Sequence, residues 1–323
     1  MLIGISGTPA SGKSEVVRYL TFQGFQTIDY KRSSGEDGKA ADRHASTVFE
    51  TFEELSDFVT KCWNNNYVLN NICDLDILET LKIKPFFLHI SIDSPMLLRY
   101  ERYIEKYSLN KEEFKIEDFV RLTDEFLYLN SHISVISAAV IKIINNKSLI
   151  EDLYVTLSRL DLMDLTRLRP SWDSYFMRLA DLAAFRSNCM KRRVGCVIVR
   201  DNRVIATGYN GTPRGFANCN EGGCGRCNGS STGSGAGLAT CLCLHAEENA
   251  LLESGKDRIG SGSILYCNTC PCLTCSIKIA QIGICEVVFS QRYLMDDLSS
   301  SVLRTAGIRI RQFVPAQEGV VVI

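Results

Sequence analysis

The sequence lacks the features that would place it in a membrane, in a secretory route or on a polyanion. No apolar run approaches the roughly 20 residues that span a bilayer. The first residues, Met-Leu-Ile-Gly-Ile-Ser-Gly, carry neither a basic segment nor a signal-peptide cleavage site. Basic and acidic side chains number 36 and 37, so no overall positive field exists to hold a nucleic acid. We therefore expect a soluble intracellular protein, cytoplasmic with a nuclear location left open, and neither a membrane nor a nucleic-acid partner.

The composition is that of an ordinary globular chain, with 46% apolar and 23% charged residues. A length of 323 residues favours two domains. The charge balance changes near Arg169-Pro170, from 20 basic and 25 acidic residues before this point to 16 and 12 after it. We predict domains at residues 1–165 and 170–323, with no internal repeat. The small polar residues from Asn228 to Gly237 predict a flexible loop tip.

The first residues predict a phosphate-binding loop. A short apolar strand, Leu2–Ser6, leads into Gly7-Thr-Pro-Ala-Ser-Gly12-Lys13-Ser14, and an amphipathic helix follows to Phe22. This is the G-x-x-x-x-G-K-S/T pattern in the strand, loop and helix context that it requires. Gly7 and Gly12 would let backbone N–H groups face phosphate oxygens. Lys13 would neutralise the β- and γ-phosphates, and Ser14 would hold the Mg²⁺ of a bound nucleotide.

Residues 1–150 resemble the small nucleotide and metabolite kinases, most closely those of the dephospho-coenzyme A kinase type. The resemblance rests on Gly7–Ser14, on Thr27-Ile28-Asp29, and on the segment from His89 to Arg102. It implies a parallel sheet, with Asp29 as a carboxylate on the substrate side. Because Lys31-Arg32 depart from the family pattern, a kinase, a nucleotide sensor and an inactive scaffold all stay open. Arg99 and Arg102 could reach phosphates from a lid, but on a helix we expect them to be solvated surface residues. We expect His44, His89 and His132 to be surface or packed histidines.

The cysteines are concentrated in the second half of the chain. Of 14 cysteines, only Cys62 and Cys73 precede residue 170. In an intracellular chain, closely spaced cysteines with a nearby histidine indicate zinc rather than disulfides. His245-Ala-Glu247 and Pro271-Cys272-Leu-Thr-Cys275 together form the H-x-E…P-C-x-x-C signature of zinc deaminases.

The spacing of this motif explains its chemistry. Cys272 and Cys275 at a helix start place two thiolates one turn apart, and His245 supplies a third ligand, so a fourth position stays open for water. Glu247 would move protons between that water, the ring nitrogen and the leaving ammonia. A zinc ribbon without chemistry is the alternative, but a ribbon has no glutamate beside its histidine.

The elements around this motif predict a mixed sheet with helices on both faces. We expect a helix over 171–189 with Leu179, Leu182, Ala183 and Phe185 on its apolar side. Strands over 194–199 and 204–209 would form a hairpin that turns at Asp201-Asn202. Further strands are expected over 264–267, 286–290 and 308–313, with helices at His245, at Cys275 and from Asp297.

The segment 171–323 resembles the deoxycytidylate (dCMP) deaminases, and the two-domain arrangement resembles their fungal form. The resemblance rests on Gly208–Gly215, His245–Leu251, Pro271–Cys275 and Arg309–Phe313. It implies a cytidine-deaminase-like α/β/α domain that converts dCMP to dUMP for thymidylate synthesis, with zinc on His245, Cys272 and Cys275 and with Glu247 as the proton shuttle. It further implies a homo-oligomer, of six copies in that family, that dCTP activates and dTTP inhibits. Gly208, Tyr209, Asn210 and Gly211 would then contact substrate or allosteric nucleotide, with Asn210 at base and sugar.

A second metal site is expected in the loop before His245. Four thiolates close a structural zinc site, and this loop offers five: Cys219, Cys224, Cys227, Cys241 and Cys243. Which four bind is left open. Cys267 and Cys270 are expected to be packed thiols, because the catalytic metal needs an open position.

Three other functions stay open. The first domain could make the protein a nucleotide kinase, the second could be a zinc-binding module without turnover, and the deaminase could act on another amino-base. Editing of tRNA or DNA is the weaker deaminase reading because the second domain carries a balance of only +4 (16 basic minus 12 acidic). Arg214 and Arg292 are candidates for reading the 5′-phosphate.

Overall fold

The structure is a computed structural model that describes residues 1–31, 46–229, 240–292, 296–314 and 319–322. It divides into two compact units, Met1–Arg169 with Ala316–Ile323, and Pro170–Pro315. His44, Arg32 and most of the predicted loop tip from Asn228 to Gly237 lie outside the described residues.

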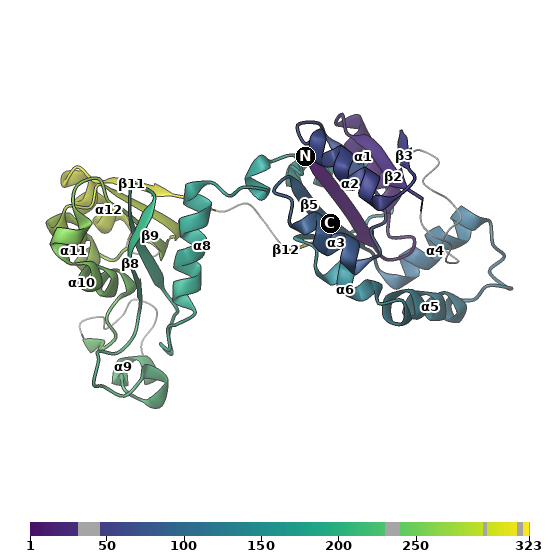
Figure 1. Cartoon of the computed structure of the whole chain (residues 1–323). Coiled ribbons are helices and arrows are strands. Elements are labelled where there is room, and N and C mark those ends of the chain that lie inside the picture. Colours follow the sequence, from purple (N-terminus) through teal and green to yellow (C-terminus); the bar gives the residue numbers. More distant parts are fainter. Residues whose placement is uncertain (32–45, 230–239, 293–295, 315–318, 323) are drawn as a thin grey trace. The chain divides into compact units, whose positions relative to one another are not determined.

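The first unit is built on a seven-stranded sheet in which every pairing is parallel (Figure 1). The strand order is β12-β6-β5-β1-β4-β2-β3. Its strands are β1 (Leu2–Gly7), β2 (Gln26–Tyr30), β3 (Thr47–Phe49), β4 (Tyr67–Leu69), β5 (Phe87–Asp93), β6 (Ile141–Ile144) and β12 (Gly319–Val322). Its helices are α1 (Lys13–Phe22), α2 (Phe52–Lys61), α3 (Leu75–Lys82), α4 (Met96–Tyr107), α5 (Ile116–Asp124), η1 (Glu125–Leu129), α6 (His132–Ser137), α7 (Ile150–Leu160) and η2 (Leu165–Arg167).

Helices cover both faces of this sheet, as a parallel sheet requires. Ile3 and Ile5 of β1 pack toward α1 and α7, while Leu2 packs toward α2 and α3. The alternation follows from the two-residue period of a strand. The parallel sheet expected for the first domain is confirmed.

The second unit holds a five-stranded mixed sheet of order β11-β10-β9-β7-β8. Pairings β10–β11 and β9–β10 are parallel, whereas β7–β8 and β7–β9 are antiparallel. Its strands are β7 (Gly195–Arg200), β8 (Arg203–Tyr209), β9 (Ile264–Thr269), β10 (Glu286–Gln291) and β11 (Arg309–Gln312). Its helices are α8 (Trp172–Ala184), η3 (Cys219–Glu221), α9 (Gly225–Asn228), α10 (Ala246–Ile259), α11 (Leu273–Ile282) and α12 (Asp296–Thr305). The predicted mixed sheet and its hairpin are confirmed, and Asp201 and Asn202 both have positive φ at the turn.

Two layers of helices enclose the mixed sheet (Figure 1). Cys196 and Ile198 of β7 pack with α10 and α11, and Val197 and Val199 pack with α8. Gly195 allows α8 to approach closely, because a Cβ there would lie 1.9 Å from the carbonyl oxygen of Ala180. This arrangement gives the predicted α/β/α layering.

Two expectations for the second domain are wrong. The domain was predicted to run to residue 323, but β12 pairs with β6 of the first unit, with Gly319 opposite Ile141. The predicted apolar face of α8 is also wrong in part: Leu179 packs against the sheet as predicted, but Leu182 and Phe185 are 63% and 69% exposed. The buried apolar residues of this helix are instead Phe176, Met177, Ala180 and Ala184.

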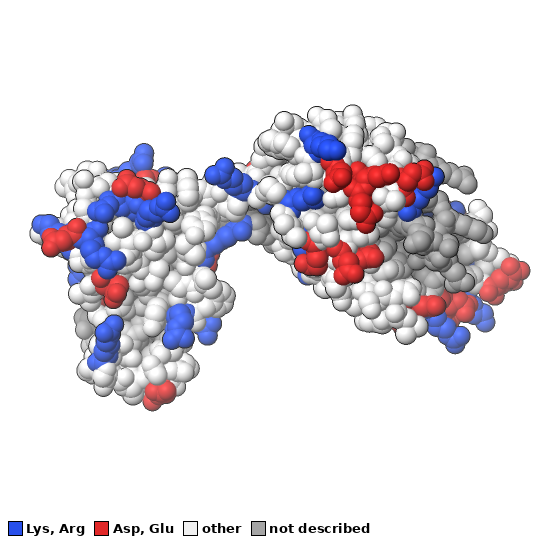
Figure 2. All heavy atoms as spheres, viewed as in Figure 1, with Lys and Arg blue, Asp and Glu red and all other residues white. Residues whose placement is uncertain are grey.

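The surface shows mixed charge. Figure 2 shows basic and acidic side chains interspersed on the visible face of the second unit. Across the described residues, no helix combines the length and the apolar character needed to cross a bilayer.

Candidate active site

Helix α10 begins at the histidine that the sequence predicted as a metal ligand. His245 is the N-cap residue, and its backbone N–H donates to Oε2 of Glu248 at 2.8 Å in a capping box. The other carboxylate oxygen of Glu248 pairs with Lys278 of α11. These contacts fix the start of α10, and Glu247 in its first turn is only 3% exposed.

Helix α11 begins at the two cysteines of the motif. Cys272 is its N-cap residue and Cys275 lies one turn later. The sulfur of each cysteine lies 3.3 Å from Nδ1 of His245, and the three donor atoms lie within 4.8 Å of one another. The structure therefore brings together the three residues that the sequence proposed as ligands.

This donor set fits zinc. One imidazole nitrogen and two sulfurs are ligands that zinc prefers, and three protein ligands leave its fourth position open. Neither Cys267 nor Cys270 belongs to the set within the described residues. Cys267 is fully buried in the core beside Cys196, and Cys270 is buried as well, as expected for packed thiols.

The electrostatics of the site follow from burial and from its internal hydrogen bonds. The Cys275 thiol donates to Cys272 and lowers the pKa of Cys272 to about 3, and the same hydrogen bond raises the pKa of Cys275. The hydrogen bond with Cys272 raises the pKa of His245 to about 9. Burial raises the pKa of Glu247 to about 7.

The Gly208–Gly211 segment lies against the start of α10. A Cβ at Gly208 would lie 2.1 Å from the carbonyl oxygen of Ala246, so glycine allows β8 to pack directly on this helix. Gly211 forms an antiparallel bridge with Leu244, and the carbonyl of Tyr209 accepts from the Asn249 side chain at 2.7 Å. The segment is thus joined to the residues on both sides of His245.

Asn210 is buried, and its side chain is held by backbone groups. Its Oδ1 accepts from the Val194 N–H at 2.8 Å, and its Nδ2 donates to the Arg192 carbonyl at 2.8 Å. The hydroxyl of Ser187 donates to the Asn210 carbonyl at 2.7 Å. An amide group has two donor hydrogens and two acceptor lone pairs, and these two contacts use one of each.

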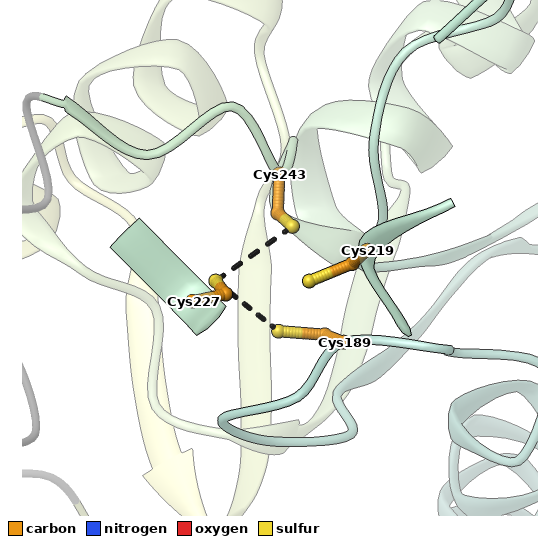
Figure 3. A group of neighbouring side chains, drawn as sticks. All are labelled: Cys189, Cys219, Cys227 and Cys243. Atoms are coloured by element: carbon orange, nitrogen blue, oxygen red, sulfur yellow. Dashed lines mark hydrogen bonds between the residues drawn. The ribbon is translucent and has the colours of Figure 1, made fainter. Parts of the chain in front are cut away.

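Six cysteines gather beside this segment, where the sequence predicted five. They form two groups of four, and within each group all four sulfurs lie within 4.8 Å of one another. One group, Cys224, Cys227, Cys241 and Cys243, is drawn entirely from the predicted five. The other contains Cys189 with Cys219, Cys227 and Cys243, and Figure 3 shows these four side chains pointing toward one another. Sequence reasoning missed Cys189 because it lies 30 residues before Cys219, just after α8.

In the first unit, the predicted strand, loop and helix are present. Gly7 ends β1, Gly12 caps α1 with φ of +105°, and Lys13 and Ser14 begin the helix. A Cβ at Gly7 would lie 2.1 Å from the carbonyl oxygen of Ile92, which requires glycine there. Nζ of Lys13 donates to the carbonyls of Gly7 and of Thr8, at 2.9 and 2.8 Å.

The two arginines near this loop, Arg99 and Arg102, differ in how deeply they are buried. Arg99 was expected at the surface, and this is wrong: it is 5% exposed and donates from Nε to the Ser94 carbonyl at 2.8 Å, near the end of β5. Arg102 is partly buried, and its guanidinium donates to Oγ of Ser94 at 3.1 Å. Asp29 lies buried within β2.

The two described histidines of the first unit are packed rather than placed for metal binding. His89 is 1% exposed, and its Nε2 lies 2.8 Å from Oγ of Ser6. Burial lowers the pKa of His89 to about 4. His132 packs against Phe126 with ring centroids 4.1 Å apart.

Comparisons with known proteins point to one family. The family described as the cytidine and deoxycytidylate deaminase zinc-binding region matches residues 170–291. A deoxycytidylate deaminase of Schizosaccharomyces pombe is 48% identical over 98% of this chain and 99% of its own length. One of Saccharomyces cerevisiae is 45% identical over 97% of this chain and 96% of its own length. A crystal structure of the dCMP deaminase from cyanophage S-TIM5 with dCMP and dUMP covers 45% of this chain and 98% of its own, at 34% identity and a TM-score of 0.37. Since the fungal relatives match along nearly the whole chain, this protein belongs to the deoxycytidylate deaminase family.

Proposed function

We propose that this protein hydrolyses dCMP to dUMP and ammonia and thereby supplies dUMP for thymidylate synthesis. The observation that carries the proposal is the convergence of His245, Cys272 and Cys275 beside the buried Glu247. The near full-length similarity to fungal proteins named deoxycytidylate deaminase supports the choice of substrate.

His245, Cys272 and Cys275 would hold the catalytic zinc. When bound, zinc acts as a Lewis acid and makes water a better nucleophile at neutral pH. Glu247 is adjacent to the three ligands in the fold but is not one of them, so its carboxylate is available for proton transfer. It takes the proton of the attacking water and delivers protons to the ring nitrogen and to the amino group that leaves as ammonia.

The Gly208–Gly211 segment is proposed to contact nucleotide, either the substrate or an allosteric ligand. Asn210 supports this through its remaining donor hydrogen and acceptor lone pair. Tyr209 is 38% exposed, and the guanidinium of Arg186 lies 5.9 Å from the centre of its ring. Arg214 and Arg292 are both exposed and stay candidates for the 5′-phosphate.

Regulation and assembly are proposed together. The protein would form a homo-oligomer, a hexamer as the family resemblance implies, that dCTP activates and dTTP inhibits. Exposed apolar side chains of α8 and its C-cap support an assembly, since exposed apolar surface can mark an interaction site. They are Trp172, Tyr175, Leu182 and Phe185, which are 46% to 69% exposed.

The first unit is proposed to bind a Mg²⁺–nucleotide through Gly7, Gly12, Lys13 and Ser14. The close approach of the loop to β5 at Gly7 and the left-handed Gly12 at the helix start support a phosphate-binding role. Three roles for this loop stay open. They are a kinase activity carried by Lys13, a regulatory nucleotide site, and a vestigial loop. The cysteine cluster of the second unit is proposed to bind structural zinc.

Ammonia release from dCMP tests the proposal. Wild-type protein should release ammonia, and Glu247→Gln should lose about 10²- to 10⁴-fold in kcat while keeping its zinc. Lys13→Ala is the matched control, because it lies outside the deaminase unit and should keep deamination without added nucleotide. Wild-type-like turnover by Glu247→Gln would refute the role of Glu247. No release by zinc-loaded wild-type protein, with or without dCTP and Mg²⁺, would refute dCMP as the substrate.

A further inference from the structure

The cysteine cluster is larger than one metal ion requires. Its six members are Cys189, Cys219, Cys224, Cys227, Cys241 and Cys243. Their sulfurs form two groups of four that share Cys227 and Cys243. Cys189 and Cys219 belong only to the first group, and Cys224 and Cys241 belong only to the second.

The distances between the sulfurs are those of thiolates around a tetrahedral ion. Cys227 lies 3.7 Å from Cys189, 3.7 Å from Cys241 and 3.9 Å from Cys243, and Cys224 lies 3.9 Å from Cys241. A zinc–sulfur bond of about 2.3 Å in a tetrahedral site places neighbouring sulfurs about 3.8 Å apart. A disulfide would need about 2.05 Å, so the spacing fits shared metal ligation and not paired cystines.

We propose that this cluster binds two zinc ions that share Cys227 and Cys243 as bridging thiolates. Cys189 and Cys219 complete the first tetrahedron, and Cys224 and Cys241 complete the second. Two closed tetrahedral ions need eight ligand positions, and six thiolates fill them when two are counted twice. A single ion would use only four of the six sulfurs and would leave two buried or half-buried thiols beside it without a ligand role. The inference rests on the proposal that the cluster binds metal and is independent of the substrate.

Burial supports a cluster that holds itself together. Cys219, Cys224, Cys227 and Cys243 are 6% exposed or less, and the six cysteines pack mainly on one another. The nearby apolar side chains of Phe216 and Leu242 are instead 57% and 46% exposed. The described ends of this loop therefore bury thiols in place of a hydrocarbon core. Metal binding by these thiols would supply the folding free energy that a hydrocarbon core supplies elsewhere.

Hydrogen-bond donors surround the sulfurs, as a thiolate cluster requires. Two Zn²⁺ ions with six thiolates leave a double negative charge. Nη1 of Arg226 lies 3.6 Å from the sulfur of Cys241, and the backbone N–H of Met190 donates to Cys219 at 3.5 Å. These donors lie on ligands of different ions, so each half of the cluster receives stabilisation.

The cluster would position the active site without contacting substrate. Cys243 precedes His245 by two residues, and Cys189 follows Ser187, which donates to the Asn210 carbonyl. In Figure 3, Cys227 of α9 lies between Cys189 and Cys243, and dashed lines join it to both. The same thiolates therefore tie together the chain that enters α10 and the chain that follows α8.

Zinc content of the purified full chain tests this inference. We expect about three zinc ions per chain by elemental mass spectrometry of the acid-digested protein: one catalytic and two in the cluster. About two would mean one structural ion and would overturn the binuclear cluster. About one would also refute the structural zinc, whereas the deaminase proposal would stand or fall separately on ammonia release.

Single cysteine variants and cadmium substitution test the cluster without relying on the total zinc content of the wild-type protein. Cys189→Ser and Cys224→Ser should each remove one ion, while the exposed Cys285→Ser is the matched control and should remove none. If either Cys189→Ser or Cys224→Ser kept all the zinc, that cysteine would not be a ligand and the cluster with two shared thiolates would be overturned. If these variants fail to fold, ¹¹³Cd-substituted wild-type protein still decides: two cluster resonances coupled through shared sulfur support the proposal, and a single uncoupled cluster resonance refutes it.

Discussion

Arg311→Ala should destabilise the second unit without touching the metal ligands. Arg311 of β11 donates from Nη1 and Nη2 to the two carboxylate oxygens of Asp173, at 2.8 and 2.7 Å. Its Nε donates at 2.6 Å to Glu286, whose side chain is 3% exposed. The same Asp173 also accepts from the hydroxyl of Tyr266 at 2.8 Å. The arginine thus joins α8, β10 and β11.

The magnitude follows from these three charge-assisted hydrogen bonds. Each contributes about 1.5–3 kcal/mol when it is protected from water. The Arg311 side chain is 36% exposed and Glu286 keeps a second partner in Arg309, so most of that sum is offset by solvation. We expect a loss of about 2 kcal/mol, which lowers Tm by about 4–8 °C for a unit of this size.

Tryptophan fluorescence reads this unit alone once Trp63 is replaced. The chain has two tryptophans, Trp63 in the first unit and Trp172 beside Asp173. Trp172 stacks on Phe176 with centroids 5.5 Å apart, so unfolding of the second unit will change its emission. Thermal unfolding should therefore be followed in a Trp63→Phe background.

Arg309→Ala is the matched control. Arg309 also contacts Glu286 at 2.6 Å, but its side chain is 73% exposed and makes one ion pair where Arg311 makes two. Its loss should lower Tm by much less. A change in Tm below about 1 °C for Arg311→Ala, or an equal change for Arg309→Ala, would refute the reasoning.

Three further outcomes are expected. Gly208→Ala should lower both stability and deamination, because its Cβ would lie 2.1 Å from the Ala246 carbonyl oxygen. The control Gly211→Ala should fold normally, because the nearest atom to its Cβ would be 3.9 Å away. Equal stability of the two variants would contradict this reasoning. The hydrogen bond from Arg311 lowers the pKa of Asp173, so the contribution of this pair to stability should be unchanged from pH 7 to pH 5 and lost only as pH falls below about 4, through the lowered pKa. Thermal unfolding of wild type and Arg311→Ala across this range checks the sign, and a difference that shrinks already between pH 7 and pH 5 would show that Asp173 is not responsible. Chelation of zinc should abolish ammonia release and lower Tm of the second unit, and added zinc should restore both; release by metal-free protein would contradict a metal-dependent site.

The parts of the site that were predictable are local in sequence. Cys272 and Cys275 lie one helical turn apart, and His245 and Glu247 lie in one helix start, so their spacing carries the geometry directly. The hairpin of β7 and β8 was predictable for the same reason, because its turn residues and its alternation are adjacent in the chain.

The parts that were missed depend on contacts distant in sequence. Cys189 joins the cluster only because the chain after α8 returns to η3 and α9. β12 pairs with β6 about 180 residues earlier, and no local pattern specifies that partner. Helix α8 has apolar residues on more than one face. The face with Phe176 and Ala180 packs on the sheet, because Gly195 of β7 has no side chain between the strand and the helix.

Position and chemistry are separable in this active site. Gly208 and the Glu248 capping box place α10 on the sheet, and the cysteine cluster holds the chain just before it. None of these groups has the proposed role of moving protons, and Glu247, which has it, takes no part in the capping box. Loss of Glu247 should therefore reduce turnover with zinc and stability intact, while loss of a cluster thiolate should reduce zinc content first and turnover as a consequence.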